Sequence, residues 1–154
     1  MSESSIEIPT FILPLQRSNL LVPNATVAEI IPYEPLQRMQ DSPDWFLGFL
    51  GWRGVQVPVV SFEMLSVKRG SFSLVSVSSA SLVILKALGG NPELRFFAMV
   101  AQALPRLVRI KENELFETGE DSGETELQKV RYADEIVSLP NLDYIESSIL
   151  EVIR

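Results

Sequence analysis

Short apolar runs, each bounded by Gly, Pro, Asn or Ser, recur along the chain and predict strands. The predicted strands cover residues 11–13, 19–22, 26–31, 55–60, 82–85, 96–100 and 107–110. The first two are close enough in sequence to form a hairpin. Pro58 cannot donate to a ladder, so the strand at 55–60 is expected at a sheet edge or beside a bulge. Many short strands at close spacing favour a barrel or a sandwich, and therefore an all-β fold.

Helical signals appear at two places. Residues 42–47 begin with a Ser that can cap, a Pro at the first helical position and an acid in the first turn, which predicts a single turn ended by Gly48. Residues 141–153 predict a short C-terminal helix with Asn141 as its cap. Its apolar face recurs at helical spacing and consists of Leu142, Ile145, Ile149 and Val152. Glu146 is expected to point away from that face.

Two irregular stretches divide the chain. The Ser-rich segment 66–81 is expected to connect two barrels, so that one subdomain covers about 11–65 and the other about 80–140. The acidic segment 111–128 contains two glycines and has little periodicity, which predicts a solvated loop. These parts together predict one domain over residues 1–154.

The composition excludes several classes of chemistry. The chain has no His and no Cys, so no disulfide, thiol nucleophile, thiolate zinc site or His-based catalytic arrangement can form within it. The net charge is −7, which argues against sequence-independent nucleic-acid binding. The acidity is local, because residues 111–154 carry twelve acidic and four basic residues, whereas residues 1–110 carry eight and nine. The polar N-terminus and the lack of a long apolar run predict a cytoplasmic protein without direct membrane insertion.

The acidic residues leave a further alternative open, which is carboxylate chemistry. The run Asp121-Ser122-Gly123-Glu124 lacks the alternating ligand spacing of a calcium-binding EF-hand loop. Paired carboxylates of the kind that hydrolyse glycosides are compatible with the composition, but no cleft signature accompanies them. A solvated loop without metal or cofactor is the favoured interpretation.

The most informative patch is the segment 42–60. It combines a turn, a glycine, a strand, a tight turn at 51–54 and a second strand. Arg53 lies in the tight turn between Trp52 and Gly54, so its guanidinium is expected to face solvent. The simpler interpretation is a hairpin whose arginine only keeps the turn soluble, since charges in loops usually do no more than that.

This patch resembles the signature region of CheW-like coupling proteins of bacterial chemosensory systems. Residues in the same frame as the family pattern are Pro43, Gly48, Arg53, Gly54 and Pro58. Upstream, Val27-Ala28-Glu29-Ile30 resembles the Val-x-Glu-Ile of the family. The chain departs from the pattern at Gly51-Trp52, at Ser61-Phe62 and near Gln102. It therefore resembles a divergent branch, most similar to the ChpC-type adaptors found beside type IV pilus chemosensory systems.

The resemblance implies a single CheW-like domain of two five-stranded SH3-like β-barrels, without catalysis or cofactor. It implies an adaptor that binds the cytoplasmic tip of a methyl-accepting chemoreceptor and the regulatory domain of a CheA-like histidine kinase, recruited to receptor arrays. Nine residues are the expected contacts with these partners: Val27, Glu29, Gly48, Trp52, Arg53, Gly54, Val57, Leu82 and Leu104.

Several of these residues also have a structural interpretation. Val27, Val57 and Val59 could line an apolar groove that receives a helix, or they could be core residues, as strand valines usually are. Trp45 is equally compatible with an interface and with a plug on a small barrel. Trp52 is expected to be exposed beside Arg53.

Three functions follow from these observations. The first is a coupling adaptor, and the second is a small-barrel module that competes within a chemosensory array without coupling it. The departures at Trp52, Ser61 and Gln102 favour the second. The third is an enzyme that uses Asp and Glu, which requires converging carboxylates with perturbed pKa values in a pocket.

Overall fold

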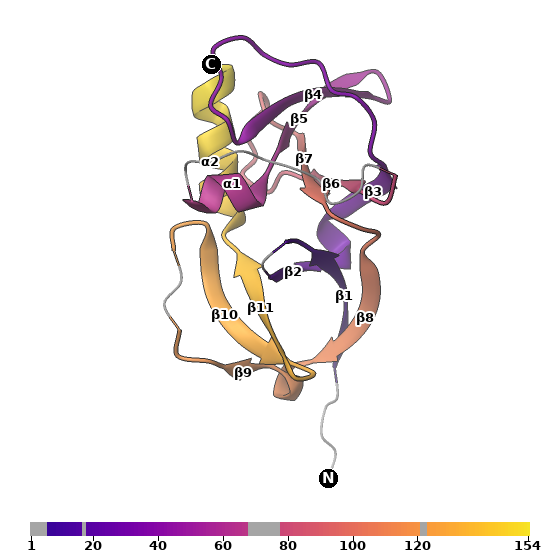
Figure 1. Cartoon of the computed structure of the whole chain (residues 1–154), viewed down its shortest axis with the longest axis vertical. Helices are drawn as coiled ribbons and strands as arrows, with labels where there is room; N and C mark the ends of the chain where they lie inside the picture. Colours follow the sequence, from indigo (N-terminus) through magenta and orange to yellow (C-terminus); the bar gives the residue numbers. More distant parts are fainter. Residues whose placement is uncertain (1–5, 17, 68–77, 121–122) are drawn as a thin grey trace.

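The computed structural model describes residues 6–16, 18–67, 78–120 and 123–154. Its strands form two sheets, each curled into a barrel, and the two barrels are stacked along the long axis of the molecule (Figure 1). Barrel A comprises β1 (Glu7–Pro14), β2 (Asn19–Pro23), β8 (Arg106–Lys111), β9 (Phe116–Glu117), β10 (Glu126–Tyr132) and β11 (Glu135–Pro140). Barrel B comprises β3 (Val27–Pro32), β4 (Phe46–Trp52), β5 (Val55–Val60), β6 (Ser81–Lys86) and β7 (Phe96–Ala101).

The remaining elements are short helices. Two 3₁₀ turns, η1 (Asn24–Thr26) and η2 (Glu112–Glu114), lie between strands, and α1 (Phe62–Val67) follows β5. The C-terminal helix α2 (Leu142–Ile153) runs along the side of barrel B (Figure 1). In the described parts of the chain, neither α-helix has the length and apolarity that crossing a membrane requires.

The two barrels do not follow the predicted division of the chain. The order in barrel A is β8-β1-β2-β11-β10-β9 and in barrel B it is β3-β6-β7-β5-β4. Barrel A therefore combines both ends of the chain, and barrel B is the middle, so the subdomain boundaries predicted at 11–65 and 80–140 are wrong. The reason is that β2 pairs in parallel with β11, through Asn19 and Val137. A parallel pair needs a long crossover, and here that crossover contains the whole of barrel B together with β8, β9 and β10 of barrel A.

The all-β prediction is confirmed, with one difference in strand number. Barrel B has the expected five strands, and barrel A has a sixth, the two-residue β9. Six of the seven predicted apolar runs lie within strands, and the seventh, 26–31, matches β3 except for Thr26, which ends η1. β1 and β2 form the expected antiparallel hairpin. The sequence patterns missed α1, β9 and β10. β9 lies within the segment 111–128 predicted as a loop, and β10 begins inside it.

The patch at 42–60 folds differently from its prediction at two points. The Phe46 N–H donates to the Pro43 carbonyl over 3.0 Å, which closes one turn, but Phe46 and Leu47 already belong to β4. Of the two alternatives for Pro58, the sheet edge is wrong, because β5 lies between β4 and β7. The bulge is confirmed, because the β4–β5 ladder shifts its register between Phe46 and Gly48, opposite Val59 and Val60. The β5–β7 ladder contains only Val59 and Val60, so Pro58 is not required to donate to it.

One hydrophobic core joins the two barrels. Leu13, Leu20 and Val22 of barrel A pack in the same cluster as Phe46, Val83 and Phe97 of barrel B and Ile145 and Ile149 of α2. Each of these side chains is fully buried, and each stabilises the fold by about 1.5–3 kcal/mol relative to exposure. The barrels are therefore held as one unit, which fixes the surface of one relative to the other.

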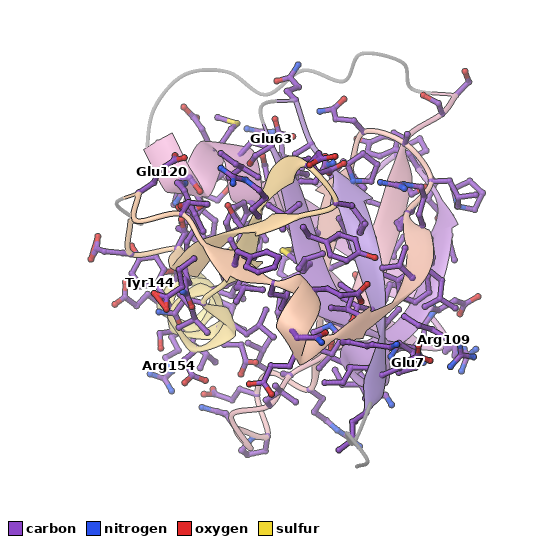
Figure 2. The ribbon with its side chains drawn as sticks, turned by 90° about the horizontal axis from the view of Figure 1, so that it is seen from below. Glu7, Glu63, Arg109, Glu120, Tyr144 and Arg154 are labelled. Atoms are coloured by element: carbon purple, nitrogen blue, oxygen red, sulfur yellow. The ribbon has the colours of Figure 1, made fainter. Side chains whose placement is uncertain are left out.

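The C-terminal helix is attached to barrel B by hydrogen bonds to the buried carboxylate of Glu146. The Asn141 cap is confirmed, because its side chain accepts a hydrogen bond from the Tyr144 N–H. The expectation that Glu146 points away from the packed face is wrong, since the residue is 5% exposed. Its two carboxylate oxygens accept hydrogen bonds from Leu88 N–H at 2.8 Å and Gly89 N–H at 2.9 Å. Figure 2 shows α2 nearly end-on, with Tyr144 and Arg154 labelled beside it.

Gly48 lies where a neighbouring segment crosses β4. Its φ is +138°, and a Cβ there would lie 2.6 Å from the Gln37 carbonyl oxygen. That approach is fixed by the two hydrogen bonds between Gln37 and Phe49. We therefore expect Gly48→Ala to lower the free energy of unfolding by about 1–3 kcal/mol. Urea unfolding checks this, with Gly51→Ala as the control, because a Cβ at Gly51 meets no atom within 4 Å. Equal stability of the two variants would contradict the prediction.

Candidate functional site: the Glu29–Arg53 pair at the open side of barrel B

The candidate site is centred on the carboxylate of Glu29. Its Oε1 accepts a hydrogen bond from the indole Nε1 of Trp52 at 2.8 Å and another from Nη2 of Arg53 at 3.2 Å. Glu29 belongs to β3, and Trp52 ends β4. These two strands are the outer strands of the five-stranded sheet and are not ladder neighbours. The Glu29 contacts therefore bridge the open side of barrel B with side chains.

Arg53 is presented by a tight two-residue turn. Trp52 pairs with Val55 across the hairpin, and Arg53 and Gly54 between them have φ angles of 50° and 78°. Two consecutive positive φ values characterise the type I′ turn that joins twisted antiparallel strands. The Arg53 side chain is 68% exposed, which confirms that its guanidinium faces solvent. The guanidinium carbon lies 4.8 Å from the centre of the Trp52 ring.

Trp52 is buried, so the prediction that it is exposed is wrong. It is 9% exposed and packs its ring edge against Phe96, with 5.0 Å between the ring centres. The reason is the alternation along β4, which directs Phe46, Gly48, Leu50 and Trp52 inward. Trp52 therefore packs beneath the Arg53 guanidinium, and its own ring is not exposed to a partner.

The structure separates the other expected contact residues into buried and exposed groups. Val57 and Leu82 are 0% exposed, so both are core residues and neither side chain reaches a partner, and Val59 is core as well. Val27 is half-buried and Gly48 is buried, whereas Gly54 is exposed. Leu104 is 70% exposed on the connection from β7 to β8, where the chain passes from one barrel to the other.

Trp45 lies outside this site. It is half-buried, contacts Phe46 edge-on with 6.1 Å between ring centres, and packs against the core that joins the barrels. Met64 of α1 and Tyr144 of α2 line the same shallow pocket. Of its two interpretations, the geometry favours the plug that covers the end of a barrel.

The Glu29–Arg53 pair contributes little to stability. Glu29 is 38% exposed and Arg53 is 68% exposed, and ion pairs this open to solvent stabilise a fold by about 0–1 kcal/mol. A non-glycine residue with a positive φ costs a similar amount. The conformation of Arg53 is therefore not explained by a gain in stability, and recognition is the role that its exposure supports.

Sequence patterns missed the polar contacts at the junction of the barrels. Glu63 of α1 accepts hydrogen bonds from the Gln16 N–H at 3.3 Å and from Nε2 of Gln102 at 3.2 Å. The Gln102 N–H donates to the Pro14 carbonyl at 2.9 Å. The departure from the family pattern at Gln102 is therefore part of the internal contact between barrels A and B. No local signal indicates it, because the partners are far apart in sequence.

The remaining chemistry of the molecule lies away from this site. A surface cavity of about 1190 Å³ lies on barrel A, where its lining is mostly apolar and includes Ile6, Ile8, Leu21, Ile110 and Leu139. Within the described ranges, no three acidic side chains come close enough together to hold a metal ion. The carboxylates of the half-buried Glu126 and the buried Glu146 are both engaged in hydrogen bonds, so neither is placed as a free general base.

The carboxylate of Glu126 has a perturbed pKa. Its side chain is 10% exposed and accepts hydrogen bonds from Nζ of Lys129 at 2.8 Å and from the Ser138 hydroxyl. Burial by itself raises the pKa of Glu126. The hydrogen bonds from Lys129 and Ser138, the charge of Lys129 and a backbone hydrogen bond with Gly123 outweigh that effect, and the pKa is lowered below 4.5.

The lowered pKa of Glu126 predicts acid sensitivity. Because the folded pKa lies below the unfolded value of 4.5, the ionised carboxylate stabilises the fold above that pH. This contribution is lost as the pH falls from the unfolded value through the folded one. Lowering the pH below about 4.5 should therefore decrease the thermal midpoint of Glu126→Gln less than that of the unsubstituted protein. Melting curves against pH check this, with the exposed Glu117→Gln as the control. If the thermal midpoint of Glu126→Gln depends on acid pH as that of the unsubstituted protein does, the prediction is wrong.

Comparison with known proteins gives the following relations. Among solved structures, the scaffolding protein TtCheW from Thermoanaerobacter tengcongensis has a similar fold, with a TM-score of 0.73 and 13% sequence identity over 92% of this chain and 89% of that one. No curated protein sequence matches significantly. The family model described as the CheW-like domain matches residues 10–148. That match covers most of the chain and includes Glu29, Trp52 and Arg53, and the chain therefore belongs to the CheW-like domain family.

Proposed function

We propose that the protein is a non-enzymatic adaptor in chemosensory signal transduction. The observation that carries the proposal is the Glu29–Arg53 pair, exposed at the open side of a rigid barrel and worth little to stability. Family membership supports the same role, and the structurally similar TtCheW is described as a scaffolding protein. An adaptor needs surfaces and a fixed geometry between them, and the shared core of the two barrels supplies that geometry.

The adaptor couples the cytoplasmic tip of a methyl-accepting chemoreceptor to the regulatory domain of a CheA-like histidine kinase. It works at receptor arrays on the cytoplasmic side, in a pathway that controls type IV pili, as the similarity to ChpC-type adaptors suggests. Binding one partner on each barrel raises the effective concentration of the second partner, without any new contact between the partners themselves. The partner contacts retained in this proposal are Val27, Glu29, Arg53, Gly54 and Leu104.

Reconstitution of kinase activity tests this function. The purified protein is mixed with the receptor and kinase encoded near its gene, and autophosphorylation of the kinase is measured with and without receptor stimulus. A coupler makes kinase activity depend on the receptor. Kinase activity that is lowered by the protein but does not respond to the receptor would instead identify a competing module.

The alternative function, a small-barrel module that competes within an array without coupling it, is less well supported by the structure than by the sequence. The departures that favour it are Trp52, Ser61 and Gln102, and all three are buried. The Ser61 hydroxyl accepts a hydrogen bond from the Met64 N–H at the start of α1. These residues act inside the fold, so they do not by themselves remove an exposed contact that a coupler needs.

A further inference from the structure

We infer that Trp52 is a positioning residue, which holds the guanidinium of Arg53 in one orientation so that it can receive a carboxylate of the partner. The inference rests on the proposed function for its partner, but its structural part concerns this chain alone. It replaces the expectation that Trp52 contacts the partner directly, because the side chain is buried.

Two different contacts connect Trp52 to the exposed ion pair. Its ring lies beneath the Arg53 guanidinium at 4.8 Å, within the range of a cation–π interaction. Its Nε1 donates to the Glu29 oxygen that also accepts from Arg53. The indole therefore fixes both the arginine and the carboxylate on which the arginine rests.

Trp52 is itself held in place, as a positioning residue must be. Its ring meets Phe96 of β7 edge-on, and the residue belongs to the apolar cluster of Leu50, Val57 and Ile84 inside barrel B. An exposed arginine normally samples many rotamers, and ordering such a side chain on binding costs about 0.5–1.5 kcal/mol. An arginine that is already ordered avoids that cost.

The orientation of Arg53 indicates what it binds. Among the described residues, the guanidinium donates one hydrogen bond, from Nη2 to Glu29, and an arginine has five N–H donors. Because the side chain is 68% exposed, the remaining donors are accessible to a carboxylate of a partner, which arginine binds with two parallel hydrogen bonds. Val55, which is 40% exposed and lies opposite Trp52 in the hairpin, adds apolar surface beside them.

Nuclear magnetic resonance relaxation of arginine side chains tests the positioning in the isolated protein. We expect the Arg53 Nε–H to have a higher order parameter than that of Arg131, which is exposed on β10. Trp52→Leu removes the ring and the N–H, and should lower the Arg53 value to that of Arg131. Trp52→Phe keeps a ring above Phe96 and should give an intermediate value. Equal mobility of the two arginines in the unsubstituted protein would overturn the inference.

A second signal covers the case in which a Trp52 variant does not fold. The chain has two tryptophans, so the indole N–H signal of Trp52 is easily assigned. In the otherwise unchanged protein, Glu29→Leu removes the acceptor of the Trp52 N–H, so it should shift that signal and speed its exchange with solvent, while the Trp45 signal stays in place. A Trp52 signal that does not respond to Glu29→Leu would contradict the hydrogen bond on which the positioning depends.

Binding then connects the orientation to recognition. Trp52→Phe should weaken binding to a chemoreceptor tip fragment or to the kinase regulatory domain about 3- to 30-fold. In an Arg53→Ala background the same substitution should have no further effect, because the residue it positions is gone. Additive losses would overturn the positioning role. If the unsubstituted protein binds neither probe, the proposed function fails, whereas the relaxation measurements still decide whether Trp52 orders Arg53.

Discussion

Arg53→Glu is expected to abolish binding to the receptor tip or to the kinase regulatory domain while the protein remains folded. The substitution places a second carboxylate beside Glu29, removes the stacking on Trp52 and reverses the charge offered to the partner. Arginines at the centre of interfaces commonly contribute 2 kcal/mol or more, so the loss should be at least about 30-fold. The measurement is calorimetric titration of each partner into wild-type and variant protein.

The stability of the Arg53→Glu variant separates recognition from folding. The exposed pair contributes about 0–1 kcal/mol, which for a chain of this length corresponds to a change in the thermal midpoint of at most about 2–4 °C. Arg131→Glu is the matched control, since Arg131 is an exposed arginine on the other barrel. A variant that binds normally shows that Arg53 is not at the interface, and a variant that unfolds shows that its role is structural.

Glu146→Gln is expected to destabilise the protein by about 1–3 kcal/mol. In the structure, one carboxylate oxygen accepts from Leu88 and the other from Gly89. A glutamine side chain has one acceptor and one donor, so one of the two backbone N–H groups would face another donor. A hydrogen bond to a charged acceptor is also stronger than one to an amide. The connection between β6 and β7 would therefore lose its attachment to α2.

Two measurements check this prediction. Urea unfolding gives the change in stability, with Glu151→Gln as the control on the exposed side of the same helix. Hydrogen exchange gives the location, because the amides of Leu88 and Gly89 should exchange faster in Glu146→Gln. Unchanged stability together with unchanged protection of both amides would show that the carboxylate does not hold the helix to the barrel.

The burial of Trp52 changes how the departures from the family pattern are understood. In the sequence, a tryptophan beside an exposed arginine indicates a surface contact. In the structure, the same residue lies under the arginine and bridges β4 to Glu29 of β3. Ser61 and Gln102 are similar, since both take part in internal hydrogen bonds. These departures from the family pattern therefore lie inside the fold, and one of them, Trp52, contacts both members of the Glu29–Arg53 pair.

Local patterns in the sequence determined much of this protein. Short apolar runs bounded by Gly, Pro, Asn or Ser located seven strands, and the cap and spacing at 141–153 located the C-terminal helix. The glycine after Arg53 marked the tight turn that exposes the guanidinium. These features depend on neighbouring residues, on backbone conformation and on side-chain periodicity, so they can be deduced without knowing the rest of the fold.

Only the tertiary structure decided how the strands combine and which residues form the site. The pairing of Asn19 with Val137 makes one barrel from both chain ends, and no local pattern specifies a partner more than a hundred residues away. The same holds for Glu146, which accepts hydrogen bonds from Leu88 and Gly89 on the connection after β6. It also holds for the hydrogen bond between Glu29 and Trp52. Burial and hydrogen bonding between distant segments are properties of the packed molecule. For this reason Trp52, which the sequence places beside an exposed arginine, is buried in the structure and lies beneath the Arg53 guanidinium.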